Sequence, residues 1–404
     1  MNIGFIVERN VYFKTFGPVI EEAIKKGHQV FCLHNYSQQR TGSKGYQFPD
    51  INQTPKFKNG QAVSFEFQTE KELIGKVLEN NIHVVVSLEF IEAQLSVKNR
   101  LKEKGVFWVS LQSSFDTGPI SGKNLAMPDK FFLYSRGWLG WMFEYLKQSS
   151  KIQEENFLAF ENKLQGKVSF VGSSVFDQVN VIDKKEIRER WSIPENKKIF
   201  LLVPFPFGSS LKTIWTKYVY GTRFFSKKND FYLTKAIREF CDENNALLLV
   251  KSRKKDPVKK YLAKVADRVL YDEGFYPTTM MECLAISDIC LSFYSTVAME
   301  AACSRVPHIC VAPLVRDWKD LQSIYFETIF KEMGDFFDFP GVSWKLSIPD
   351  AIEKLKKASF SDFTLDESKL EKYHQKFIGN LSKSYSSDII KEIKDLICPT
   401  NHCH

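Results

Sequence analysis

A short stretch late in the chain combines residue types that suit the binding of phosphate and ribose. Ser295 and Thr296 follow an apolar strand predicted at 288–292 and stand where a helix at 295–305 should begin. The first turn of a helix leaves backbone N–H groups unpaired and carries partial positive charge, so hydroxyls placed there add donors for a phosphate. Glu300 lies one turn deeper on the same predicted face, where a carboxylate can accept hydrogen bonds from both hydroxyls of a ribose. The same residues also fit ordinary helix capping, in which the serine and the glutamate only stabilise the helix.

Predicted strands and helices alternate along the chain in two successive series. In each series, short apolar runs typical of buried parallel strands are separated by amphipathic helical segments. The predicted strands are 2–7, 28–33, 84–88, 106–111, 130–135 and 168–172, followed by 198–205, 246–251, 288–292 and 306–313. Two such series predict an α/β protein with two doubly wound Rossmann-like domains that face a cleft. Ligands of such sheets bind outside the carboxyl ends of the strands.

The domain boundaries follow from the charged segment between the two series. An N-terminal domain is predicted at 1–180, a linker at 181–196 and a C-terminal domain at 197–375. An amphipathic helix is predicted near 366–397. Residues 376–404 should form a C-terminal helix and tail that pack back on the first domain.

The composition excludes several classes of protein. With 404 residues, of which 44% are hydrophobic and 26% charged, the chain is neither disordered, collagen-like nor a coiled-coil rod. The 56 basic and 48 acidic residues give a net charge of +8, a mild excess that favours phosphate-bearing ligands or an anionic membrane surface. No nucleic-acid-binding motif is present, so no nucleic-acid partner is predicted.

Several features predict a cytoplasmic protein that holds no metal. No apolar stretch approaches a membrane span of roughly eighteen residues, and no basic segment precedes the first apolar run, so neither a span nor a signal peptide is expected. The eight cysteines are scattered, which is typical of buried thiols in a reducing compartment. Cys398, His402, Cys403 and His404 lie in a terminal tail and are not predicted to bind a metal.

A glycine and an aspartate follow the last predicted strand of the first series. The segment VSFVGSSVFDQV at 168–179 contains Gly172 at the strand end and Asp177 further on. Together with the stretch around Ser295, it resembles the two-domain nucleotide-sugar glycosyltransferases of the GT-B fold, where a similar strand-Gly-small-x-x-x-Asp element stands at the domain junction. The chain is most similar to the branch that contains UDP-N-acetylglucosamine 2-epimerases, CDP-glycerol glycerophosphotransferases and bacterial surface-polysaccharide transferases.

A basic segment supports the resemblance and departs from it at one position. LLLVKSRKKDP at 247–257 is similar to the strand-Lys-x-His-Pro element of the glycerophosphotransferase branch, with Lys251 in the matching place. Arg253 stands where histidine is usual, which argues against glycerophosphate transfer. A solvated basic loop is the competing interpretation of this segment.

The resemblance implies that the second domain holds a UDP-, CMP- or CDP-linked donor. Hydroxyl groups would contact the phosphate, and a carboxylate would bind the ribose. Basic side chains would add positive charge, and the arginine guanidinium would donate hydrogen bonds to two phosphate oxygens. The implied donor-binding residues are Ser295, Thr296, Glu300, Lys251, Arg253, Gly208, Ser209 and Ser210. The last three lie in PFPFGSS at 204–210, where glycine lets a backbone approach the ligand, although a turn needs glycine too.

The first domain would then bind the acceptor and supply a catalytic base. Displacement at an anomeric carbon needs a group that takes the proton of the acceptor hydroxyl. The candidates are Glu8, Glu89 and Asp116, each of which follows a predicted strand and is equally an ordinary loop carboxylate. Glu8 is placed best, because the loop after the first strand faces the cleft in this fold. The chain has no Asp-x-Asp motif, which fits a metal-free transfer in which N–H groups and basic side chains stabilise the leaving phosphate.

These features predict a metal-independent glycosyltransferase, without a cofactor, that moves a sugar onto a bacterial surface glycan or a lipid-linked precursor. Glycerophosphate-type transfer, epimerisation of a nucleotide sugar, and nucleotide-sugar binding without catalysis are the alternatives. Epimerases of the family carry a His-Arg-x-x-Asn element where this chain reads PFPFGSS. The resemblance therefore fails where epimerisation would need it.

Two stretches interleave aromatic and basic residues, at 138–147 and at 211–235. This pattern suits a surface that touches anionic lipid headgroups, and it would place the protein at the inner face of the membrane. A core helix or a contact with a protein partner is the competing interpretation.

Overall fold

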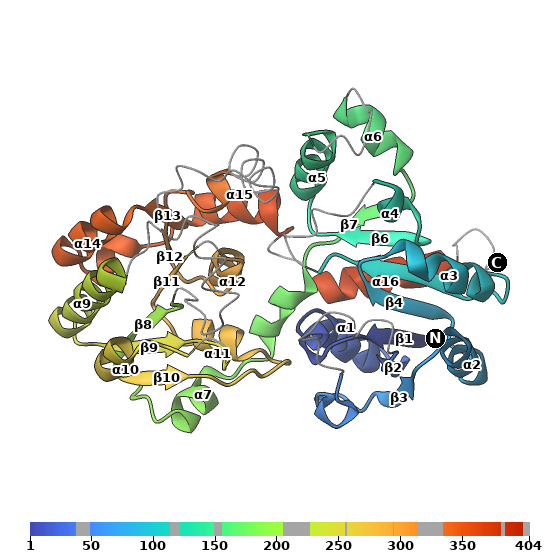
Figure 1. The fold of residues 1–404 in the computed structure, drawn as a ribbon, viewed down its shortest axis with the longest axis horizontal. Coiled ribbons are helices and arrows are strands. Elements are labelled where there is room, and N and C mark those ends of the chain that lie inside the picture. Colours follow the sequence, from blue (N-terminus) through green and yellow to red (C-terminus); the bar gives the residue numbers. More distant parts are fainter. Residues whose placement is uncertain are drawn as a thin grey trace. The chain divides into compact units, whose positions relative to one another are not determined.

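The computed structural model describes residues 1–37, 49–113, 122–148, 156–204, 227–254, 257–293, 295–312, 334–380 and 384–398. It divides the chain into two compact units (Figure 1). Unit 1 comprises Met1–Gln178 and Ile378–His404, and unit 2 comprises Val179–Phe377. Each unit contains one parallel sheet.

Unit 1 is built on a seven-stranded parallel sheet in the order β3-β2-β1-β4-β5-β6-β7. Its strands are β1 (Asn2–Val7), β2 (Gln29–Asn35), β3 (Val63–Phe67), β4 (Val84–Leu88), β5 (Phe107–Leu111), β6 (Lys130–Leu133) and β7 (Val168–Phe170). Its helices are α1 (Phe13–Lys25), α2 (Glu70–Glu79), α3 (Leu95–Lys102), α4 (Gly122–Ala126), α5 (Arg136–Gln148), α6 (Phe157–Lys163) and α16 (Tyr385–Ile397). The strand order reverses between β1 and β4, which makes this pair the topological switch point of the sheet.

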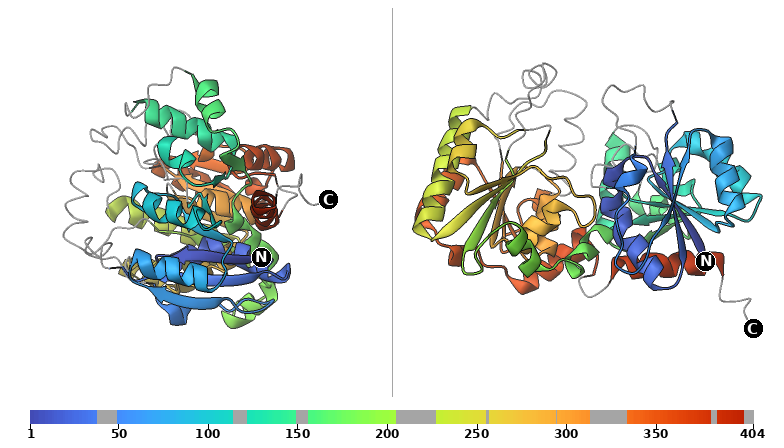
Figure 2. Two further views of the ribbon diagram at one scale, coloured as in Figure 1. Left: turned by 90° about the vertical axis from the view of Figure 1, so that its right-hand side faces the viewer. Right: turned by 90° about the horizontal axis from the view of Figure 1, so that it is seen from below.

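The central strands of unit 1 are apolar on both faces because helices cover both faces (Figure 2). On one face, Ile6 of β1 packs in a core with Leu73 of α2 and Leu101 of α3. On the other face, Phe5 meets Phe16 of α1 edge-on, with ring centroids 5.2 Å apart. Helix α16 packs against α1, so the end of the chain completes the first unit.

Unit 2 is built on a six-stranded parallel sheet in the order β10-β9-β8-β11-β12-β13. Its strands are β8 (Lys198–Leu202), β9 (Ala246–Lys251), β10 (Arg268–Leu270), β11 (Ile289–Phe293), β12 (His308–Val311) and β13 (Ser343–Leu346). Its helices are α7 (Lys184–Arg190), α9 (Lys227–Glu243), α10 (Lys260–Val265), α11 (Thr279–Ala285), α12 (Val297–Cys303), α14 (Ile348–Lys357) and α15 (Glu367–Phe377). The switch point of this sheet lies between β8 and β11.

Both faces of the unit 2 sheet are also covered (Figure 2). Phe200 of β8 lies in a core with Ile237 of α9 on one face, and α14 contributes Leu355 to the same core. Leu201, the next residue, points to the other face and packs with Leu284 of α11 and Ala301 of α12. The alternation of these strand residues therefore serves two separate apolar cores.

The predicted fold class is confirmed, since each unit is a doubly wound parallel sheet between helices. Three strands, β3, β10 and β13, were not predicted from the sequence. All three stand at sheet edges and read VSFEF, RVL and SWKL. An edge strand is partly solvated and tolerates polar residues, so it lacks the apolar run that marks a central strand.

Residues 181–196, predicted as a linker, fold as part of unit 2. Asp183 caps α7 by accepting hydrogen bonds from the N–H groups of Lys185 and Glu186, and Ile187 and Trp191 are buried in the core of that unit. Most residues of this segment are charged or polar, so its few apolar residues did not indicate a helix that packs on the core. Similarly, the helix predicted near 366–397 is two helices: α15 belongs to unit 2 and α16 to unit 1.

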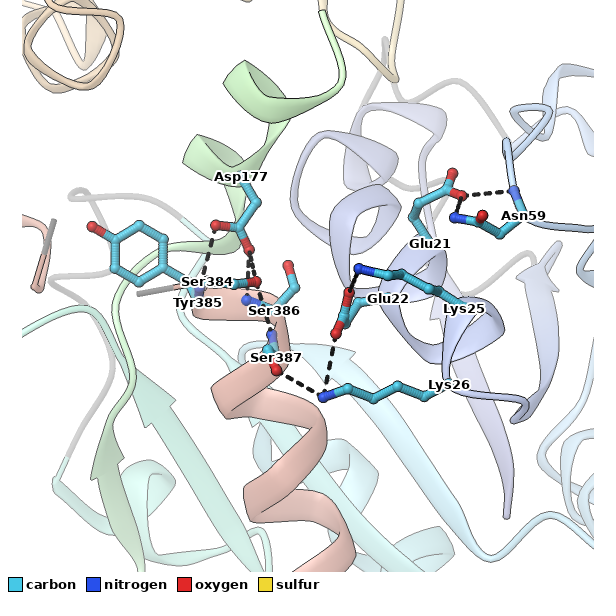
Figure 3. A network of polar contacts seen from close by, with 10 residues as sticks. All are labelled: Glu21, Glu22, Lys25, Lys26, Asn59, Asp177, Ser384, Tyr385, Ser386 and Ser387. Atoms are coloured by element: carbon cyan, nitrogen blue, oxygen red, sulfur yellow. Dashed lines mark hydrogen bonds and ion pairs between the residues drawn. The ribbon is translucent and has the colours of Figure 1, made fainter. Parts of the chain in front are cut away.

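A buried aspartate holds the amino end of α16 in unit 1 (Figure 3). The Asp177 carboxylate accepts hydrogen bonds from the backbone N–H groups of Tyr385 and Ser386, at 3.2 and 2.6 Å. Gly172, with a φ of +80°, lies directly beneath the Tyr385 ring. Asp177 thus satisfies helix N–H groups that would otherwise be buried without a partner.

We expect Gly172→Ala to destabilise unit 1 strongly. A Cβ at this position would lie 2.0 Å from Cδ1 of Tyr385, in addition to the cost of a left-handed backbone. The expected loss is about 2 to 5 kcal/mol of unfolding free energy, measured by urea denaturation. Gly105→Ala is the matched control, because Gly105 has a φ of +77° with no atom near its Cβ position, and it should lose only about 1 kcal/mol. Equal losses in the two variants would show that contact with Tyr385 is not what constrains Gly172.

Candidate functional site

The carboxyl edge of the unit 2 sheet brings the Ser295–Thr296 pair to its switch point. These residues follow β11, whose Leu291 accepts a hydrogen bond from the N–H of Val203 just beyond β8. Helix α12 begins at Val297, two residues later than predicted, with Thr296 as its N-cap residue. The Ser295 hydroxyl accepts a hydrogen bond from the N–H of Val297 at 3.3 Å. Both side chains remain partly exposed at the point where ligands of doubly wound sheets bind.

Glu300 lies one turn into α12, and its N–H donates to the carbonyl of Thr296 at 3.3 Å. The residue is only 3% exposed. Burial raises the pKa of the Cys290 thiol on β11 well above its usual value, and the charge of Glu300 raises it further. Because Glu300 is buried, a ligand that bonds its carboxylate must itself become buried.

A buried hydroxyl–imidazole chain fixes the end of β11. The Ser292 hydroxyl bonds to Nε2 of His308 on β12 at 2.8 Å and to the carbonyl of Phe293 at 3.1 Å. Nδ1 of His308 bonds to the Ser343 hydroxyl of β13 at 2.9 Å. Burial lowers the pKa of His308 to about 3, so its ring is neutral at pH 7. These hydrogen bonds were not predicted from the sequence, in which His308 is recognised only as a strand residue.

The basic candidates lie on the other side of β8. Lys251 ends β9 and is 8% exposed, with its ammonium donating to the carbonyl of Ser252 at 2.7 Å. Burial lowers the pKa of this ammonium below its usual value, against the opposing effect of Glu273 and other nearby acidic groups. Arg253 is exposed. Because β9 and β11 flank β8, the strand that ends in Lys251 and the strand that precedes Ser295 are about 10 Å apart at the usual strand spacing.

Four predicted site residues lie outside the described part of the chain. They are Gly208, Ser209, Ser210 and Asp116. Their predicted roles stay predictions.

Two candidate bases occupy matching positions at the switch point of unit 1. Phe5 of β1 pairs with Val86 of β4, so Glu8 and Glu89, each three residues further on, stand at the same level of the sheet. Glu8 is partly buried and accepts a hydrogen bond from the Tyr12 hydroxyl at 3.0 Å. Each of these two carboxylates therefore stands one residue beyond the end of a strand at the switch point of unit 1.

Glu89 is held in a backbone conformation that is rare for a side chain larger than glycine. Its φ is +57°, and its N–H donates to the carbonyl of Leu111 at 2.9 Å. The Ser87 hydroxyl donates to the Glu89 carbonyl at 2.7 Å, and Ser113 donates to the Glu89 carboxylate. Such strain persists only where the surroundings fix it, and it concentrates at functional sites.

The two aromatic stretches differ in exposure. Trp138, Trp141 and Phe143 of α5 are 1%, 1% and 2% exposed, so the lipid-contact interpretation of 138–147 is wrong and this helix belongs to the core. Of the stretch 211–235, the described part begins at 227, and there Phe231 and Tyr232 are 47% and 48% exposed.

Neither a membrane-spanning helix nor a metal-binding cluster occurs among the described residues. No helix among them is long and apolar enough to cross a lipid bilayer. Within the same residues, no group of three or more His, Cys, Asp or Glu side chains is arranged to hold a metal ion.

The chain resembles known proteins in structure but not in sequence. No protein-family model and no curated protein sequence matches it. Among solved structures, it is similar to the UDP-GlcNAc 2-epimerase of Methanocaldococcus jannaschii, with 12% identity over 98% of this chain and 99% of that chain and a TM-score of 0.57. The UDP-GlcNAc 2-epimerase of Neisseria meningitidis bound to UDP-GlcNAc gives 12% identity, 98% and 100% coverage, and a TM-score of 0.55.

A variant of the wall teichoic acid polymerase TagF, soaked with CDPG, is also similar, with 11% identity over 98% of this chain and 89% of that chain and a TM-score of 0.57. These likenesses confirm the predicted resemblance to the GT-B fold.

The strain at Glu89 predicts an unusual order of stability for two substitutions. Glu89→Gly and Glu89→Ala both remove the carboxylate, but only the alanine keeps a Cβ at a φ of +57°. We expect the glycine variant to be more stable by about 1 kcal/mol in urea denaturation, the reverse of the usual order. If the alanine variant is the more stable, the left-handed conformation of this residue is not maintained.

Proposed function

We propose that the chain is a metal-independent glycosyltransferase that moves a sugar from a nucleotide-sugar donor to a bacterial surface glycan or glycolipid precursor. The observation that carries the proposal is the partly exposed Ser295–Thr296 pair at the unit 2 switch point of a GT-B fold. Two structures that share this fold were solved with a nucleotide sugar or CDPG, which supports a nucleotide-linked donor here.

In this proposal, unit 2 binds the donor. Ser295, Thr296 and the first N–H groups of α12 would contact a phosphate, and Glu300 would bind the ribose. Lys251 and Arg253 would supply positive charge from β9, together with the segment that contains Gly208, Ser209 and Ser210. Helix α12 has only seven residues, so individual N–H and O–H donors, more than a macrodipole, would stabilise the leaving phosphate.

Unit 1 would bind the acceptor and provide the base. Glu8 and Glu89 stand at its switch point, and Asp116 remains the third candidate. A base must lie within hydrogen-bond reach of the acceptor hydroxyl and be ionised before the reaction. Both carboxylates accept a hydrogen bond from a hydroxyl, Glu8 from Tyr12 and Glu89 from Ser113, and Glu89 is also held by its backbone contacts. One of these carboxylates would take the proton as the new glycosidic bond forms and the nucleotide leaves.

Epimerisation of a nucleotide sugar is the second candidate function. The likeness to two UDP-GlcNAc 2-epimerases over nearly the whole chain favours it as strongly as it favours transfer. Glycerophosphate-type transfer is supported by the likeness to TagF and by Lys251, which matches the lysine of the Lys-x-His-Pro element. Arg253, however, replaces the histidine of that element. Binding without catalysis is the remaining alternative.

The products formed from a panel of UDP-, CMP- and CDP-linked donors distinguish these functions. We expect free nucleotide to be released only when an acceptor glycan or lipid-linked acceptor is added. A sugar that is altered at C2 while still attached to its nucleotide would replace the proposal with epimerisation. Release of a glycerol-phosphate unit from CDP-glycerol onto the acceptor would assign glycerophosphate transfer, and binding without turnover would leave a binding protein.

Glu300→Ala tests the donor site directly. If Glu300 holds the ribose hydroxyls, the variant should lose about 1 to 3 kcal/mol of nucleotide binding free energy in calorimetry. Glu282→Ala is the control, because Glu282 is a unit 2 carboxylate of α11 that pairs with Arg190 at 2.7 Å, outside the proposed site. Both variants are checked by urea denaturation. Unchanged affinity in Glu300→Ala, whatever its stability, would refute the ribose role.

Glu8→Gln and Glu89→Gln identify the base. The amide keeps the size of the side chain but cannot take a proton, so the variant at the base should lose at least ~100-fold in turnover and keep its nucleotide affinity. Turnover is followed by nucleotide release with a fixed donor and acceptor. Near-normal turnover in both variants would move the assignment to Asp116.

A further inference from the structure

One exposed stripe of α9 combines two large aromatic rings with lysines. Lys228, Phe231, Tyr232 and Lys235 follow the spacing i, i+3, i+4 and i+7 and therefore share one face of the helix. The two rings are 47% and 48% exposed and lie side by side, with centroids 5.9 Å apart. The Lys228 ammonium lies 5.9 Å from the centre of the Tyr232 ring. Adjacent exposed rings flanked by cations on both sides differ from the singly scattered apolar residues of an ordinary surface.

The core does not need these two rings. The opposite side of α9 already supplies Leu233, Ile237 and Phe240 to the unit 2 core, all of them nearly inaccessible to solvent. Phe231 touches Tyr261 at the edge of this core, with centroids 5.6 Å apart, yet half of its surface remains exposed. The described residues leave the outer sides of both rings uncovered, which points to a partner for this face.

Helix α14 extends the stripe into a broader surface. It lies beside α9 (Figure 1). The two helices border a groove of about 580 Å³. Tyr232 and Lys235 line the groove from α9, and Ile352 and Lys356 line it from α14. We call Lys228, Phe231, Tyr232, Lys235 and Lys356 the α9 face.

The charge of this surface is positive. Its lysines are Lys228, Lys235 and Lys356, and its acidic residues are Glu239 and Glu353. Glu239 pairs with Lys235 at 3.5 Å and Glu353 with Lys357 at 2.7 Å. The surface therefore keeps an excess of cations around its exposed rings.

From this combination we infer that the α9 face docks on the surface of an anionic lipid bilayer. Aromatic rings with polar edges partition into the headgroup region, and each lysine near an anionic surface adds a further attraction. The groove between the helices would take up lipid headgroups between its lysines. The inference stands on the exposure and charge of this face and holds whether or not the chain transfers a sugar.

Co-sedimentation of the full chain with vesicles tests the inference. We expect binding to vesicles of phosphatidylglycerol and phosphatidylcholine, and little binding to phosphatidylcholine alone. The double variant Phe231→Ser, Tyr232→Ser should bind the anionic vesicles at least about tenfold more weakly, because the apolar part of the contact is lost. Leu158→Ser on α6 is the matched control, since Leu158 is 60% exposed in unit 1, and it should bind as the unaltered chain does.

The lysines give a second, independent measure. Lys228→Ala and Lys356→Ala should each weaken binding to the anionic vesicles about fivefold, and added salt should weaken binding of the unaltered chain. Thermal unfolding and nucleotide affinity of every variant are measured in parallel to show that unit 2 is intact. If the unaltered chain does not bind a nucleotide, the proposed function is wrong, but the inference about the α9 face is not affected.

Three outcomes would overturn the inference. The first is equal vesicle binding by the unaltered chain and the double variant. The second is equal binding to neutral and anionic vesicles. The third is a self-associated chain that the double variant converts to a monomer in sedimentation velocity, because the α9 face would then be an interface between copies.

Discussion

The parallel direction of all strands in each sheet determines where chemistry can occur in this protein. Every carboxyl end lies at one edge of its sheet, and at the switch points the connections depart to opposite sides. Backbone groups and side chains beyond β1 and β4, or beyond β8 and β11, are therefore less covered than those elsewhere along the edge. Glu8 and Glu89 stand at the first of these points and Ser295 at the second.

The two switch points are stabilised in a similar way. In each unit, the first strand past the switch carries a serine one residue before its end: Ser87 in β4 and Ser292 in β11. Ser87 bonds to Ser110 of the next strand at 2.9 Å, and Ser292 bonds to His308 of the next strand at 2.8 Å. Each serine also bonds a backbone carbonyl at the strand end. Because these hydroxyls are buried, breaking the bonds is costly, and the strand ends that carry the candidate residues are held in place.

The sequence predicted those parts of the fold that depend on burial from both sides. The central strands show continuous apolar runs, whereas β3, β10 and β13 do not, because edge strands are partly solvated. The aromatic stretches show what composition alone misses. Trp138, Trp141 and Met142 in α5 have helical spacing and fill the core, whereas Phe231 and Tyr232 fall off the buried stripe of α9. Both helices contain aromatic and basic residues, and the helical period shows which of the rings belong to the core face.

The candidate site was predictable only in part. The order of strands and helices was enough to predict where Ser295 and Glu8 would lie, because strand ends follow from the apolar runs. The left-handed backbone of Glu89 and the His308 chain depend on contacts between distant strands, which the local sequence does not reveal. The burial of Glu300 is likewise a tertiary effect.

The positions of Ser295 and Lys251 constrain any ligand that uses both. The strands that lead to them flank β8 on opposite sides, about 10 Å apart at the usual strand spacing, which is farther than a single phosphate reaches. A ligand that contacts both must therefore cross the end of β8 with its long axis across the strands.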